Sequence, residues 1–296
     1  MSPPLRYAIR QTSRYTYAGV VPFARHIVRL TPVTSGPVEV ESQRLTIDPA
    51  PEERSERVDF FGNGVLDIAL EDPHATLDIV ADAAVTVHPE APLDPAATPA
   101  WEDVRETAYT AHDLGARSPV HFLFASRLVP IDATIGIWAA QSFRPGRPVL
   151  AGGLDLMRRI KSEFAYDPTA TDVTTPTRQA FELKRGVCQD FAHVMIAGLR
   201  WLGLPAGYVS GYLRTTPPPG RPRLEGADAM HAWVAVWCGP EAGWQGLDPT
   251  NAMIAGGDHI PIAFGRDYAD VSPIDGVIVA AGGHTLEVAV DVVERA

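Results

Sequence analysis

The stretch RGVCQDFAH, residues 185–193, decides how this chain can be interpreted, because it sets one of only two cysteines, Cys188, directly before an apolar helix. A thiol acts as a nucleophile only as its thiolate, and the unpaired amides and dipole at a helix start stabilise that anion. A cysteine on a helix can equally be a small buried hydrophobe. Position alone therefore leaves Cys188 as either a nucleophile or a core residue.

The segments around Cys188 predict helices followed by a sheet. Apolar residues recur at helical spacing from Phe191 to Leu202, and Gly203 followed by Pro205 ends that helix. Further helices are predicted over 101–111, 131–142 and 150–164, with a loop over 165–175. Alternating strands are predicted downstream at 206–213, 231–237, 244–247, 276–280 and 286–293. Helices first and antiparallel strands afterwards indicate an α+β fold.

Two later segments supply partners for a nucleophilic thiol. They are DAMHAW at 228–233 and GLDPTN at 246–251. If His231 opens one strand and Asp248 closes its antiparallel neighbour across the 239–243 turn, both side chains lie at the same end of the sheet. The carboxylate then fixes the imidazole tautomer and stabilises the cation that pairs with a thiolate. The order and spacing favour a Cys188, His231, Asp248 triad over three unrelated structural residues.

The first ninety residues predict a separate β domain. Short alternating runs occur at 5–10, 38–47, 65–70 and 77–80, and the 61–64 segment FGNG between two of them fits a hairpin turn. Proline and alanine without periodicity mark the stretch from 87 to 99 as a connection. The predicted organisation is a β domain over 1–90, a linker over 91–100 and a catalytic domain over 101–296.

These motifs together resemble the transglutaminase-like superfamily, which has the papain-like cysteine protease fold. The matching segments, within roughly 150–255, are 164–167, 185–193, 199–213, 228–233 and 243–251. The first ninety residues resemble the β domain that precedes such cores in bacteria. The resemblance implies an N-terminal antiparallel β domain followed by a core in which the nucleophile heads a helix packed on an antiparallel sheet.

The resemblance also implies roles for the three residues. Cys188 is the expected nucleophile, His231 the general base and then acid, and Asp248 its orienting partner, acting on a carboxamide or peptide carbonyl through a thioester. The backbone amide of Cys188 is the expected oxyanion donor. The second donor, an upstream side chain in the family, stays unassigned.

Other residues near the motifs keep two interpretations each. Asp190 is either a substrate contact or a helix-start charge favoured by the dipole. Aromatic strand residues line a cleft or belong to the core. The tentative substrate contacts are Gln189, Asp190, Tyr212 and Trp233. Tyr208 keeps the same two interpretations, whereas His193 and Cys238 are expected to be structural.

Composition limits the partners. The 296 residues carry a formal charge of -11, which disfavours nucleic acid. No apolar stretch is long enough to span a membrane and the start lacks a signal pattern, so a cytoplasmic protein without membrane association is expected. No metal-ligand spacing such as His-Glu-x-x-His and no EF-hand loop occurs, and thioester chemistry needs no cofactor. A peptide, protein or small amide is the expected substrate.

Three functions fit these residues. The favoured one is a cysteine hydrolase that cleaves a peptide or other amide bond. The second is acyl transfer to an amine in place of water, which differs only in how well water is excluded. The third is an inactive binding module, disfavoured because all three triad residues are retained. A proline-rich loop at 217–222 is expected to border the cleft.

Overall fold

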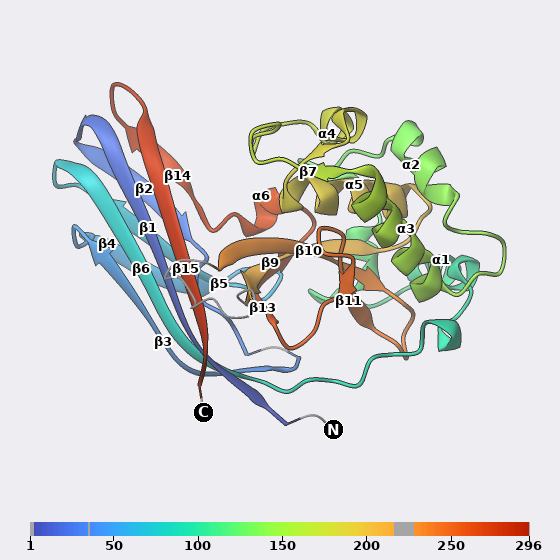
Figure 1. Ribbon diagram of the computed structural model, residues 1–296. Helices are drawn as coiled ribbons and strands as arrows, with labels where there is room; N and C mark the ends of the chain where they lie inside the picture. The colour runs from blue at the N-terminus through green and yellow to red at the C-terminus, as the bar shows by residue number, and fades with distance from the viewer. Residues whose placement is uncertain (1–2, 35, 216–227, 296) are drawn as a thin grey trace, which may run out of the picture.

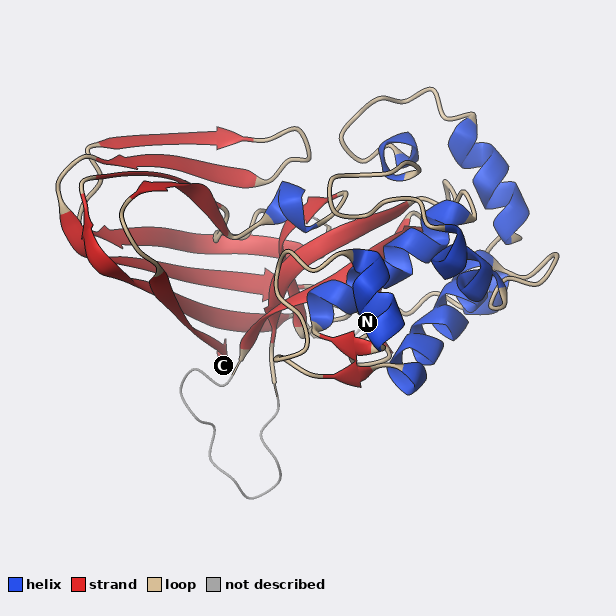
Figure 2. Cartoon of the chain, turned by 90° about the horizontal axis from the view of Figure 1, so that it is seen from above, coloured by secondary structure: helices blue, strands red, loops and turns tan. Residues whose placement is uncertain are grey.

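The computed structural model describes residues 3–34, 36–215 and 228–295. A β sandwich and a helix-covered sheet lie side by side (Figure 1), and the view from above separates the mainly stranded half from the half that carries most helices (Figure 2). This arrangement confirms the predicted α+β class. The proline-rich loop at 217–222 lies outside the described residues.

The sandwich is built from two four-stranded antiparallel sheets. Their strand orders are β15-β1-β6-β3 and β14-β2-β5-β4. The strands are β1 (Leu5–Val21), β2 (Phe23–Val28), β3 (Val38–Asp48), β4 (Glu53–Val58), β5 (Gly64–Leu70), β6 (His74–Val87), β14 (Ile274–Val279) and β15 (His284–Arg295). Alternation along β1 turns Tyr15 and Tyr17 inward, where they pack with Leu66 and Ile68 of the facing sheet.

The C-terminal strands correct the predicted domain organisation. The sequence prediction placed everything after residue 100 in the catalytic domain, yet β15 pairs with β1 from Arg6↔Arg295 to Tyr17↔His284. Strand β14 pairs with β2 in the other sheet. Unpaired strand edges must find a partner or be shielded, and an amphipathic pattern does not state which sheet supplies that partner. The β domain therefore consists of the first ninety residues together with roughly the last twenty.

The other half centres on a five-stranded antiparallel sheet in the order β12-β11-β10-β9-β13. Its strands are β9 (Ala206–Leu213), β10 (Ala229–Trp237), β11 (Trp244–Asp248), β12 (Met253–Ile254) and β13 (His259–Gly265). The helices are α1 (Trp101–Tyr109), α2 (Ala133–Ala140), α3 (Val149–Glu163), α4 (Thr177–Leu183), α5 (Cys188–Trp201) and α6 (Tyr268–Val271). Helix α5 packs on this sheet, with Val194 and Ile196 in one core with Val234 and Leu247.

The four predicted helices, which are α1, α2, α3 and α5, and the strands β3, β5, β9, β10 and β11 lie within a few residues of their expected bounds. Strands β1 and β6 extend well beyond the predicted runs, and β2, β4, β12, β13, α4 and α6 were not predicted. The expected linker over 91–100 contains a short 3-10 helix, Pro95–Ala97, and docks on the start of α3 through the Val149 N to Pro99 O hydrogen bond. Among the described residues, no helix is long and apolar enough to cross a membrane.

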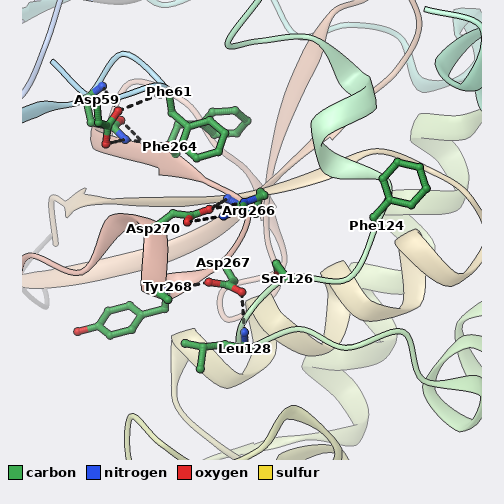
Figure 3. Close-up of polar contacts among 12 residues, drawn as sticks. Asp59, Phe61, Phe124, Ser126, Leu128, Phe264, Arg266, Asp267, Tyr268 and Asp270 are labelled. Carbon is green, nitrogen blue, oxygen red and sulfur yellow. Dashed lines mark hydrogen bonds and ion pairs between the residues drawn. The ribbon is translucent and has the colours of Figure 1, made fainter. Parts of the chain in front are cut away.

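Several contacts join the halves, among them an apolar cluster and a hydrogen-bonded turn. Tyr7 and Val292 of the sandwich pack against Tyr212 and Ile260 of β9 and β13. The predicted hairpin turn supplies the second contact, because the side chain of Asn63 both donates to Phe264 O (2.9 Å) and accepts from Phe264 N (2.8 Å). Asp59 braces that turn, as Figure 3 shows.

Candidate active site

Cys188 is the first residue of α5 and is half-buried. The short strand β8 (Arg185–Gly186), paired in parallel with β7 (Ala165–Tyr166), delivers the chain to this helix start. Asp190 caps it by accepting from Val187 N (2.8 Å) and from the Thr171 hydroxyl (2.7 Å). A side chain at Gly186 would collide with that carboxylate. The motif around Cys188 therefore builds the capped helix start that stabilises a thiolate.

His231 and Asp248 meet at one end of the sheet, on the adjacent strands β10 and β11. The Nε2 atom of His231 lies 2.8 Å from Oδ2 of Asp248, and both side chains are buried. The sequence predicted this juxtaposition, and the antiparallel pairing of the two strands produces it.

Asp248 sits in a shell of donors that keeps it ionised. Its Oδ1 accepts from the backbone N–H groups of Thr250 (2.9 Å) and Asn251 (3.1 Å), and its Oδ2 accepts from the Asn251 side chain (2.8 Å). Burial favours the neutral acid, but hydrogen bonds from His231, His259 and Asn251 hold the pKa of Asp248 well below its usual range. The turn at residues 248–251 thus supplies both the Asp248 carboxylate and three of the hydrogen bonds that it accepts.

His231 connects this carboxylate to the thiol. Burial lowers the pKa of His231, but hydrogen bonds with Asp248 and Cys188 outweigh it and raise the pKa to about 9. Since Nε2 faces Asp248, Nδ1 is the ring nitrogen left to serve Cys188. The arrangement favours a protonated His231 beside Cys188 at neutral pH.

His259 is a member of the site that sequence reasoning missed. Its Nε2 lies 3.2 Å from the same Oδ2 of Asp248, and Gly256 N donates to its Nδ1 (3.3 Å), which places the ring proton on Nε2. Trp233 packs edge-on against this ring, 5.2 Å between centroids. His259 is the first residue of β13, which pairs with β9. No local sequence motif predicted that pairing.

The same cluster is where a metal ion would find ligands. One atom each from His231, Asp248 and His259 converge within 4.8 Å, among the residues that the structure describes. Both imidazoles already donate to Asp248 Oδ2, so the hydrogen bonds alone account for the convergence.

The pKa values of three tyrosines respond to the charge of Cys188. Burial first, and then the charge of a Cys188 thiolate, raises the pKa of Tyr166 and places the pKa of Tyr208 well above its usual value. Burial raises the pKa of Tyr268 as well, with the same thiolate contributing. Tyr268 is held at the start of α6 by Asp267, whose carboxylate accepts from Leu128 N (2.7 Å) and Ala269 N (2.9 Å), and its ring points away from that carboxylate (Figure 3).

The four tentative substrate contacts lie in less accessible places than the sequence suggested. Gln189 is 8% exposed and donates to Val173 O. Asp190 forms the helix cap described above. Trp233 is buried behind the two histidines.

Tyr212 does not lie at the site. It pairs with Met230 and Ile260, so its side chain is on the opposite face of the sheet from His231, and its hydroxyl donates to Leu30 O of the sandwich (3.1 Å). The alternation of apolar residues along β9 does not indicate that the β sandwich covers this end of the strand.

The residues expected to be structural have such roles. His193 accepts from Tyr268 N (3.2 Å) and anchors α6 to α5. Cys238 is fully buried, its thiol donates to Val236 O, and burial raises its pKa to about 12.

Comparison with known proteins places the chain in a family. Residues 138–249 match the model of the transglutaminase-like superfamily, and residues 7–86 match the bacterial transglutaminase-like N-terminal region. Uncharacterized proteins of Mycobacterium tuberculosis and Mycobacterium bovis are 39% identical to it, over 97% of this chain and 92% of theirs. The chain belongs to the transglutaminase-like superfamily, a family of cysteine enzymes, as the sequence predicted.

Two further likenesses cover different lengths. A candidate cysteine protease from Cytophaga hutchinsonii superposes with a TM-score of 0.77 at 21% identity, over 99% of this chain and 91% of that one, and so shares the whole fold. A protein-glutamine gamma-glutamyltransferase of Pseudomonas aeruginosa is 37% identical over 99 residues, which are 32% of this chain and 15% of that protein.

Proposed function

We propose that this protein is a cysteine hydrolase that cleaves a peptide or other amide bond through Cys188, His231 and Asp248. The observation that carries the proposal is the orientation of His231. Its Nε2 is hydrogen-bonded to an ionised, buried Asp248, and the ring also forms a hydrogen bond with Cys188. That orientation gives a general acid and base beside a thiol at a helix start.

In the proposed reaction the Cys188 thiolate adds to the carbonyl carbon, and the carbonyl electron pair moves to oxygen. The C–N bond then breaks while His231 gives the proton on Nδ1 to the leaving amine or ammonia, which leaves a thioester on Cys188. Water adds to the thioester and passes a proton back to Nδ1. Collapse releases the carboxylic acid and restores the thiolate and the imidazolium.

The oxyanion formed in each step needs donors. The amide of Cys188 is one, because first-turn amides have no intrahelical acceptor. Tyr166 is our proposal for the second, since it is upstream of Cys188, 59% exposed, and paired through β7 with Gly186, two residues before Cys188.

Acyl transfer to an amine is the second candidate. The local similarity to a protein-glutamine gamma-glutamyltransferase falls on part of the chain and favours it. Both reactions share the thioester, so the outcome depends on whether water or an amine reaches it first.

A digest of casein offers many amides at once and tests both reactions in one experiment. The protein is incubated with the digest and an excess of an isotopically labelled primary amine, and the products are identified by mass spectrometry. We expect cleaved or deamidated peptides to exceed amine adducts, to vanish with Cys188→Ala and to persist with Cys238→Ala.

Adducts that outnumber the hydrolysed products would favour transfer over hydrolysis. Products that survive Cys188→Ala, or no product with any chain, would contradict a cysteine hydrolase.

A further inference from the structure

A cavity of about 360 Å³ lies between the β sandwich and the residues that lead into His231. It is lined by Gln11, Ser13, Tyr15, Asp228, Met230, Tyr268, Pro273, Ile274, Leu286, Val288 and Val290. Its walls come from β14 and β15, which are edge strands of the two sheets, from β1, and from Tyr268 of α6. The volume falls at the lower end of small-molecule sites.

Two polar residues interrupt the apolar inner face of β1 at this cavity. Along this face, Tyr7 and Ile9 pack against the catalytic sheet, and Tyr15 packs within the sandwich. Gln11 and Ser13 lie between Ile9 and Tyr15, and each is only 1% exposed. The Gln11 side-chain amide donates to the Ser13 hydroxyl (3.2 Å), but Gln11 Oε1 has no hydrogen-bond partner. A buried unpaired carbonyl is costly, so a ligand that completes it is the natural explanation.

The cavity adjoins the reaction centre and opens to solvent. Tyr268 forms one wall, and its backbone N–H donates to His193 Nε2 (3.2 Å) of α5, the helix that Cys188 begins. Met230 of β10 forms another wall, on the face of the sheet opposite His231. On the opposite side Leu286 and Val288 are 47% and 48% exposed, which is unusual for apolar side chains on an inner face. A substrate can therefore extend from Cys188 past Tyr268 into this space.

The unpaired atoms indicate the chemistry of the ligand. Gln11 Oε1 offers an acceptor, and the Ser13 hydroxyl, which accepts from Gln11, retains its own proton to donate. A primary or secondary amide supplies a donor and an acceptor in one planar group. If the side-chain amide of Gln11 were turned by 180°, its unpaired group would be the NH2 donor in place of the Oε1 acceptor. A ligand amide has both a donor and an acceptor, so it can pair with the unpaired group in both orientations.

We propose that this cavity is a substrate subsite in which the β sandwich binds an amide group of the substrate, through Gln11 and Ser13, beside the bond that Cys188 attacks. The inference rests on the proposed function. It gives the β domain a direct part in selecting peptide-like substrates, with the apolar walls holding the aliphatic atoms next to the amide.

Binding to the full-length Cys188→Ala protein tests the subsite without any chemistry. The probes are pentanamide and its near-isosteres hexan-2-one and pentanoate, which lack a donor. The chain has five methionines, so the ¹³C-methyl signal of Met230 can be assigned with Met230→Leu and followed during titration. We expect pentanamide to shift the Met230 signal, leave the core residues Met157 and Met195 unchanged, and bind about tenfold more tightly than either isostere.

Substitutions then locate the contact. Gln11→Leu should remove the preference for the amide without lowering the melting temperature, because it deletes an unpaired buried group. Ser13→Ala, which removes the donor with less change of volume, should weaken amide binding in the same way. Thr12→Val is the matched control, since its side chain lies on the other face of β1.

Equal binding of amide and ketone, or an amide preference that survives both Gln11→Leu and Ser13→Ala, would overturn the subsite. These results do not depend on turnover. A Cys188→Ala chain that still hydrolyses amides would instead refute the cysteine mechanism and leave the binding result standing.

Discussion

His231 Nε2 lies 2.8 Å from Asp248 Oδ2, and the same oxygen also takes a hydrogen bond from His259. This shared carboxylate oxygen orients the active-site imidazole, because the donor on Nε2 leaves Nδ1 directed to Cys188. Three side-chain donors around one buried oxygen also explain why Asp248 stays ionised. The arrangement makes the protonation of His231 the property most open to experiment.

Replacing Asp248 with asparagine should shift the pH dependence of the reaction. The hydrogen bond from His231 to the carboxylate raises the pKa of His231 to about 9, so kcat/KM should fall as the pH rises through about 9 and the imidazolium is lost. Asp248→Asn turns an acceptor toward Nε2 into a donor. We expect kcat to fall on the order of 10³- to 10⁴-fold and the alkaline limb to move to lower pH. A limb that keeps its position in Asp248→Asn would contradict this role.

The two cysteines should differ in alkylation by iodoacetamide. Cys188 is half-buried at a helix start beside His231, whereas burial raises the pKa of Cys238 to about 12. We expect rapid labelling of wild type and Cys238→Ala near pH 7, and almost none of Cys188→Ala, measured by intact mass against time. Comparable rates for the two thiols that rise only above about pH 8.5 would show that Cys188 is an ordinary thiol.

His259 should act as a positioning residue for Asp248. Replacement by phenylalanine removes one donor from a buried carboxylate, which should cost about 1–3 kcal/mol in the free energy of unfolding and lower kcat about tenfold. His259→Gln keeps a donor and should recover part of the activity.

A purely packing role for His259 predicts a different pattern. It would lower stability in His259→Phe while leaving the pH profile of kcat unchanged, and His259→Gln would then give no recovery. The two profiles, measured at matched folded fractions, separate the alternatives.

Asn63 should hold the sandwich to the catalytic sheet. Asn63→Ala leaves the buried backbone N–H and C=O of Phe264 without their partners, and we expect a loss of roughly 1–3 kcal/mol in urea unfolding. Glu53→Ala is a suitable control, since it breaks only the exposed ion pair with Arg25, worth about 0–1 kcal/mol. An Asn63→Ala protein as stable as that control would show that the turn contributes nothing to the junction.

The sequence predicted the site where local chemistry defines it. The helix start at Cys188, the strand that carries His231 and the Asp248 turn each depend on neighbours within a few residues, such as Asp190 at the cap and Asn251 in the turn. Capping, alternation and turn preferences act over that range. A hairpin joins the last two segments, so their meeting also followed from short-range pairing.

The sequence did not predict the contacts between segments that are far apart in the chain. His259 reaches Asp248 because β13 adds to the sheet beside β9. Tyr212 faces away from the site because the β9–β10 register places it opposite Met230, on the face that the sandwich covers. The pairing of β1 with β15 joins the two ends of the described chain. An alternating pattern fixes which face of a strand is apolar but not which strand lies beside it.

The sequence by itself thus determined the identities and order of Cys188, His231 and Asp248, because these depend on residue type and local backbone preference. Tertiary structure decided the rest. It placed His259 as a further donor to Asp248, it added the C-terminal strands to the β domain, and it formed the cavity that Gln11 lines together with Met230 and Tyr268. Those features arise from packing between segments far apart in the chain, where register and burial are set by the whole fold.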